Sequence, residues 1–129
     1  MNVELEIAVI KKFVKKDKQD RYIRLLSSKK RRVKFIKALA HFSDFNPDKM
    51  DQVNEPIDQY VLAKIQKLAV NASRCYVISE NSRLDQQPID TSLALQEIIG
   101  YGMGAIIVFG NADIIYYEGE EPKNRLISK

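Results

Sequence analysis

Residues 105–118, AIIVFGNADIIYYE, decide the fold more than any other stretch of the chain. Ala105–Phe109 is continuously apolar, which is typical of a strand buried on both faces of a sheet. Gly110-Asn111 is a strong tight-turn signal, and residues 113–118 supply β-branched and aromatic residues for an antiparallel return strand. The stretch therefore predicts a β-hairpin. The core that we expect around it contains Leu95, Ile98, Ile99, Ile106, Val108 and Ile114.

Helical spacing of apolar residues dominates the chain before this hairpin. The 3.6-residue period predicts four helices, at about residues 3–15, 17–26, 29–42 and 57–70. Further elements are a strand at Arg74–Ser79, a helix at about 91–100 and a short final strand at 126–128. Residues 43–56 contain two prolines and several Asn and Asp residues, so they are predicted to form a linker.

These elements predict an α+β architecture. An N-terminal bundle of about four helices would pack with a small mixed sheet of three to four strands that contains a β-α-β-β unit. The β-α-β step would be a right-handed crossover if its two strands were parallel. The length of 129 residues predicts a single domain, with a basic helical part at 1–50 and a helix plus the small sheet at 51–129.

Composition restricts the cellular setting. The chain has one cysteine, Cys75, so no internal disulfide can form. The first residues lack the basic region that precedes the apolar core of a signal peptide. The longest apolar run, Ala105–Phe109, is far shorter than the roughly 20 residues that a membrane span needs. We therefore expect a cytoplasmic, reducing compartment and no membrane span.

Charge is distributed unevenly along the chain. Residues 1–50 contain 14 Lys and Arg against 6 Asp and Glu, whereas residues 51–129 contain 7 against 11. Most of the positive charge lies between Lys11 and Lys37. A field of this kind attracts nucleic acid, an anionic membrane surface or an acidic protein, but it can also serve only solubility.

The strongest candidate site is the basic block Lys29-Lys30-Arg31-Arg32, which opens a predicted helix and is extended by Lys34 and Lys37. The partial positive charge of a helix N-terminus disfavours cations there, whereas its free N–H groups suit an anion such as phosphate. The alternative is a face of solvated charges with no ligand. A DNA-reading helix-turn-helix is less favoured because the connection Ser27-Ser28 lacks glycine and the block offers no Asn or Gln for adenine.

Other motifs favour structural roles. The glycines of GYGMG at residues 100–104 follow a helix and precede a strand, unlike phosphate-binding loops, so we interpret them as a helix cap and a close contact. The glutamates of residues 118–121 are typical of an exposed turn. His41 can pair with Asp44 at a helix end, and Cys75 is expected to be a small core residue.

We therefore expect a non-catalytic module that binds an anionic polymer, such as nucleic-acid backbone, with no cofactor and no metal. The predicted contacts are Lys11, Lys12, Lys15, Lys16, Arg24, Lys29, Lys30, Arg31 and Arg32. The alternative is a protein-interaction module: an adaptor, an inhibitor or a self-associating subunit, with an acidic protein or a homo-oligomer as partner. A third hypothesis, a small hydrolase or nuclease, would combine His41 or residues 118–121 with the basic face.

Overall fold

The computed structural model describes residues 2–53, 57–67, 73–121 and 124–129. These residues form five α-helices and a six-stranded sheet, so the α+β class is confirmed. The helices are α1 Val3–Phe13, α2 Gln19–Leu26, α3 Lys29–Ala38, α4 Ile57–Lys67 and α5 Thr91–Ile98. The strands are β1 Met50–Gln52, β2 Arg74–Ser79, β3 Pro88–Asp90, β4 Ala105–Phe109, β5 Ile114–Glu118 and β6 Arg125–Ser128. The predicted end of the fourth helix, at 68–70, lies outside the described residues.

The sheet has the order β1-β6-β5-β4-β2-β3, and every neighbouring pair is antiparallel. The prediction of a mixed sheet with three to four strands was therefore wrong. Two strands of three residues lie where the sequence predicts no strand: β1 in the predicted linker, and β3 in the segment after β2. Such short edge strands take their extended form from pairing with a longer neighbour, and no local period in the sequence encodes that pairing.

The crossover through α5 also differs from the prediction. Strand β3 runs antiparallel to β2, and so does β4, with β2 lying between them. Helix α5 therefore connects β3 to β4, and these two strands run in the same direction without pairing. Because the sequence does not predict β3, the predicted crossover joined β2 to β4. These two strands are antiparallel neighbours in the structure.

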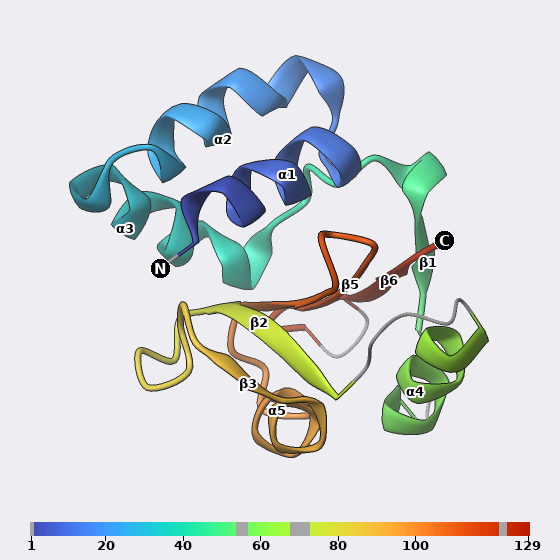
Figure 1. The fold of residues 1–129 in the computed structure, drawn as a ribbon. Coiled ribbons are helices and arrows are strands. Elements are labelled where there is room, and N and C mark those ends of the chain that lie inside the picture. Colours follow the sequence, from blue (N-terminus) through green and yellow to red (C-terminus); the bar gives the residue numbers. More distant parts are fainter. Residues whose placement is uncertain (1, 54–56, 68–72, 122–123) are drawn as a thin grey trace.

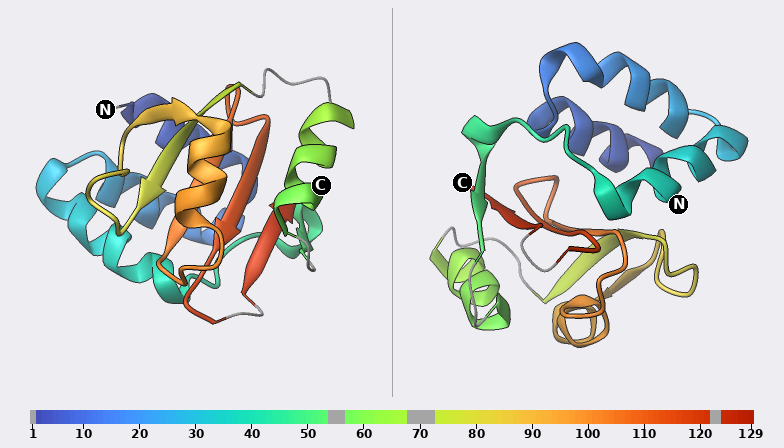
Figure 2. Two further views of the ribbon diagram at one scale, coloured as in Figure 1. Left: turned by 90° about the horizontal axis from the view of Figure 1, so that it is seen from below. Right: turned by 180° about the vertical axis from the view of Figure 1, so that it is seen from behind.

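Helices cover both faces of the sheet. Figure 1 shows α1, α2 and α3 on one face and α4 and α5 on the other, and both views in Figure 2 agree. The prediction of a four-helix N-terminal bundle was wrong for α4, whose Ile57 and Val61 pack with Val77 and Ile107 of the opposite face. The apolar stripe of α4 specified burial but did not specify which face of the sheet it would cover.

Each face of the sheet therefore has its own hydrophobic core. Ile106 and Val108 point toward α1–α3, whereas Ile114 packs on the side of α4 and α5. All residues of β4 are buried, as its continuous apolar pattern predicted, and all residues of β5 are buried as well, including Glu118. The expected core residues are thus divided between two clusters, with Ile99 only partly buried.

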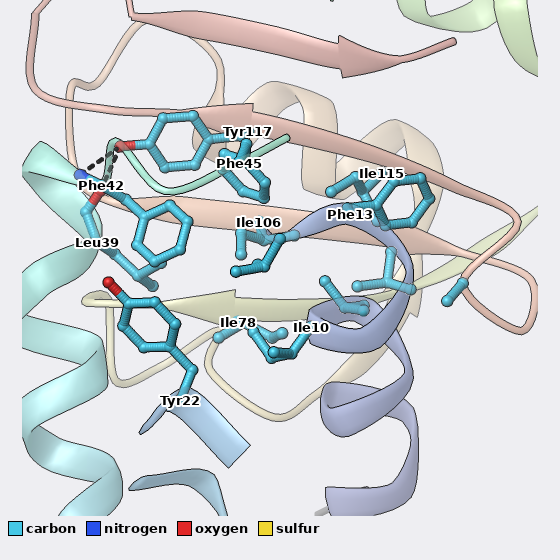
Figure 3. Close-up of a cluster of buried hydrophobic side chains, with 14 of the residues drawn as sticks. Ile10, Phe13, Tyr22, Leu39, Phe42, Phe45, Ile78, Ile106, Ile115 and Tyr117 are labelled. Carbon is cyan, nitrogen blue, oxygen red and sulfur yellow. Dashed lines mark hydrogen bonds between the residues drawn. The ribbon is translucent and has the colours of Figure 1, made fainter. Parts of the chain in front are cut away.

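An aromatic cluster joins the α1–α3 layer to the sheet, as Figure 3 shows. The ring of Tyr117 on β5 lies 5.1 Å from that of Phe45 and 6.3 Å from that of Phe42. Its hydroxyl donates to the carbonyl oxygen of Leu39 and accepts from the Phe42 N–H at 3.2 Å. Burial raises the pKa of Tyr117 to about 12. This cluster fixes the C-terminal end of α3 on the sheet.

Candidate anion-binding surface on the α2–α3 hairpin

Helices α2 and α3 form a tight helical hairpin through Ser27 and Ser28. The Ser28 hydroxyl caps α3 by accepting from the Arg31 N–H at 3.4 Å, and the Ser27 hydroxyl donates to the Ile23 carbonyl oxygen at 2.7 Å. The buried side of the hairpin includes Tyr22, Leu26 and Phe35. The period that buries these residues also turns the basic residues of both helices outward, with the exception of Arg32 on α3.

Five outward cations of this hairpin line two adjacent hollows. One hollow, of about 320 Å³, is lined by Arg21, Arg24, Leu25, Arg31 and Lys34. The second, of about 630 Å³, is lined by Ser28, Lys30, Arg31 and Lys34. We call Arg21, Arg24, Lys30, Arg31 and Lys34 the basic hairpin cluster. Arg31 and Lys34 belong to both hollows, so the cluster is one continuous surface.

No ion pair neutralises the basic hairpin cluster within the described part of the chain. All five side chains are exposed, and none makes an ion pair with a carboxylate there. The first turn of α3 contains no acidic residue. Arg21 and Arg24, and likewise Arg31 and Lys34, are like charges at i,i+3 spacing, which disfavours a helix by about 0.2–0.5 kcal/mol per pair. The hairpin therefore carries a repulsion that a bound anion would relieve.

Arg32 has a different environment from the other basic residues of α3. Its side chain is only 7% exposed and forms bidentate ion pairs with two carboxylates. Its Nε and Nη2 donate to Glu6 of α1 at 2.9 Å each. Its Nη1 and Nη2 donate to Asp85, in the β2–β3 loop, at 2.5 and 2.9 Å. Arg32 therefore joins α1, α3 and the loop instead of projecting from the basic block.

Tyr76 completes this buried network by donating from its hydroxyl to Glu6 at 2.7 Å. Burial and the bond to Glu6 both raise the pKa of Tyr76 above its ordinary value. Burial alone lowers the pKa of Arg32, but the bonds to Asp85 and Glu6 outweigh it, so the pKa rises. Arg32 remains cationic and has no free face for a polyanion.

The predicted lysines of the first helix lie away from the basic hairpin cluster. Lys11, Lys12, Lys15 and Lys16 are all exposed, at the C-terminal end of α1 and just after it. Figure 1 shows this end and the α2–α3 junction at opposite ends of the helical layer. The Lys12 ammonium donates to the Ala112 carbonyl oxygen at 2.9 Å, in the β4–β5 turn. The predicted contacts thus do not form one patch.

Lys29 faces a cavity of about 430 Å³ between α3 and the β2–β3 loop. The helix side of this cavity includes Lys37 and the apolar residues Val33 and Ile36, and the loop side includes Glu80. Lys29 therefore borders the hairpin surface without lining either of its two hollows. Among the predicted contacts, the structure brings together Arg24, Lys30 and Arg31.

The residues considered for hydrolysis are placed apart from this surface. His41 pairs through Nε2 with Glu120 at 2.8 Å, but both side chains are largely exposed, at 69% and 60%. Ser43 shares a hollow of about 420 Å³ with His41, yet no hydrogen bond joins the two side chains among the described residues. Asp44 instead accepts a hydrogen bond from the Tyr22 hydroxyl. The structure thus brings His41 and Glu120 together beside this hollow, which shares no lining residue with the two hollows of the basic hairpin cluster.

Glu118 and Cys75 are buried in the fold. The prediction of an exposed turn was wrong for Glu118, whose buried carboxylate accepts from the N–H groups of Gly100 and Gly102, each at 3.0 Å. These glycines have φ values of +90° and +70°, but the C-cap of α5 is Ile99 in an extended conformation, so the prediction of a glycine cap was wrong and both glycines belong to the turn after the helix. Burial raises the pKa of Cys75 to about 11, which leaves the thiol protonated and unreactive.

Two residues of the basic hairpin cluster, Arg21 and Lys34, were absent from the predicted contacts. Arg21 lies three residues before Arg24 on α2, and Lys34 lies three residues after Arg31 on α3. Residues at this spacing share a helix face. Extending each predicted contact by one helical turn would have found both residues.

In the described part of the chain, no group of three or more His, Cys, Asp or Glu side chains is placed to hold a metal ion. None of the helices described is both long and apolar enough to cross a membrane. Comparison of the chain with protein-family models, curated proteins and solved structures finds no match.

Proposed function

We propose that this protein is a non-catalytic binding module that engages nucleic-acid backbone through the basic hairpin cluster. The observation that carries the proposal is that five exposed cations from two helices line two adjacent hollows and make no ion pair with the residues that the structure describes. Arg and Lys side chains are the main phosphate contacts of nucleic-acid-binding proteins. The start of α3 adds the positive end of its helix dipole to the same surface.

The expected binding is independent of base sequence. The exposed aromatic residues in the described part of the chain are Tyr60 and Tyr101, and they belong to α4 and to the segment after α5. Neither is on the α2–α3 hairpin, so its surface has no aromatic platform on which bases could stack. Phosphate contacts position a protein on the backbone but carry no sequence information.

Fluorescence anisotropy at 50 mM salt, with a labelled 20-nucleotide RNA and a 20-base-pair DNA, tests this proposal. We expect Arg24→Ala/Arg31→Ala/Lys34→Ala to weaken binding by about tenfold or more, because three phosphate contacts are lost. The matched control, Lys11→Ala/Lys15→Ala/Lys16→Ala, removes the same charge from the other end of the helical layer and should bind nearly as the wild type does. Equal losses in both variants, or no binding by wild type, would refute the proposal.

A self-associating subunit is the second candidate function. It is favoured by Tyr101 and Met103, which are 67% and 41% exposed and line one small hollow next to α5. Sedimentation velocity at increasing protein concentration tests it. A dimer that Tyr101→Ser/Met103→Ser disrupts would support self-association, and a monomer at all concentrations would exclude it.

A further inference from the structure

The smaller of the two hollows is lined mainly by cationic side chains. Its volume is about 320 Å³, and its lining combines three arginines and one lysine, contributed by both helices, with Leu25 as the apolar residue. Cations that line one concave space can contact several oxygens of the same phosphate, whereas cations spread along a surface contact successive phosphates of a polymer.

The arginines indicate the chemistry of that group. A guanidinium presents a rigid planar fork of N–H donors that matches two oxygens of one phosphate, whereas a lysine acts as a point charge. A phosphate monoester carries about −1.5 to −2 charges at neutral pH and three acceptor oxygens. A backbone phosphodiester carries a single charge. Three guanidinium groups that line one hollow therefore suit a monoester better than they suit a diester.

The electrostatics of the hairpin favour the same ligand. Arg21, Arg24, Arg31 and Lys34 make no ion pair among the described residues, so four positive charges surround the hollow. One diester leaves most of this charge uncompensated, whereas a dianionic monoester neutralises about half of it. The Arg31 N–H is held by the Ser28 hydroxyl only at 3.4 Å, so the cap bond is weak at the edge of the site.

We infer that the hollow between α2 and α3 is a binding site for a phosphate monoester group. The inference rests on the proposed function for its location, and it specifies which phosphate of the ligand occupies the smaller hollow. The group can belong to the 5′ end of a nucleic acid or to a free nucleotide, which share this chemistry. The larger hollow, with Lys30, would then contact the adjoining diesters.

Anisotropy with two RNA 12-mers, identical except for a 5′-phosphate or a 5′-hydroxyl, tests this inference. Calorimetric titration with AMP, with adenosine as its control, tests the free-nucleotide source. We expect about tenfold tighter binding of the 5′-phosphate RNA, which corresponds to one additional charge-assisted hydrogen bond. We also expect AMP to bind and adenosine not to bind.

The key variant is Arg24→Lys/Arg31→Lys, which keeps the charge and removes two forks. It should lose the preference for 5′-phosphate while retaining most of the binding to 5′-hydroxyl RNA. Equal affinity for the two RNAs, with no binding of AMP, would overturn the inference and leave the proposed function standing. A preference that persists in the lysine variant would also overturn it. AMP binding without RNA binding would support the site and refute the proposed function, and no binding of any probe would refute both.

Discussion

Replacing Arg32 with methionine should destabilise the protein more than any other charge removal on α3. The substitution keeps a long apolar side chain, but it leaves the Glu6 carboxylate, which is 0% exposed, and the Asp85 carboxylate, which is 16% exposed, without their shared cation. Four charge-assisted hydrogen bonds disappear at once. Removing one partner of a buried ion pair costs about 3–5 kcal/mol. A typical domain has a free energy of unfolding of about 5–15 kcal/mol, so the variant would lose a large part of it.

Urea denaturation at pH 7, followed by circular dichroism, measures this loss directly. Arg31→Met is the matched control, since it removes the same charge from an exposed neighbour on α3 and should change stability by no more than about 0.5 kcal/mol. A loss below about 1 kcal/mol at pH 7, or an equal loss in the Arg31→Met control, would refute this account of the network.

Three further outcomes are expected. Burial raises the pKa of both Tyr22 and Tyr117 to about 12, so the unfolded state loses these protons at lower pH than the folded state does. The free energy of unfolding should therefore fall between about pH 10 and 12, by up to about 1.4 kcal/mol per pH unit for each phenol. Thermal melts across this range check this expectation, and a melting temperature that does not change with pH would contradict it. Gly104→Ala should destabilise by about 1–3 kcal/mol, because the added Cβ would lie 2.4 Å from the backbone nitrogen of Ala40; an unchanged urea midpoint would contradict that contact. Sodium chloride should raise the melting temperature of the wild type more than that of Arg24→Ala/Arg31→Ala, because salt screens the repulsion in the hairpin; equal increases would show that the cluster is not strained.

The sequence predicted the elements whose signals are local. The apolar run of β4, the turn after it and the apolar helical stripes specify burial within a few residues of themselves, and the structure contains all of them. The strands β1 and β3 could not be predicted in the same way, because three residues carry no period and their extended shape depends on β6 and β2. The face of the sheet that α4 covers likewise depends on the path of the chain between the two helical layers, and an apolar stripe does not encode that path.

The candidate site could be predicted only in part. The unusual density of cations at the start of α3 was visible in the sequence, but the burial of Arg32 was not, because its partners lie 26 and 53 residues away. One sign was available: Glu6 falls three and four residues before Val9 and Ile10, on the buried stripe of α1. A carboxylate on such a stripe requires a partner. Searching the chain for that partner would have removed one cation from the predicted surface.

The salt dependence of RNA affinity tests the central claim most directly. If the five cations of the basic hairpin cluster each contact a phosphate, log K should fall with log salt with a slope of about −3.5 for a single strand, since each contact contributes about −0.7. The Arg24→Ala/Arg31→Ala/Lys34→Ala variant should reduce the slope to about −1.4. The Lys11→Ala/Lys15→Ala/Lys16→Ala variant should leave it unchanged. A slope that the first variant does not alter would contradict the assignment of the polyanion site to the α2–α3 hairpin.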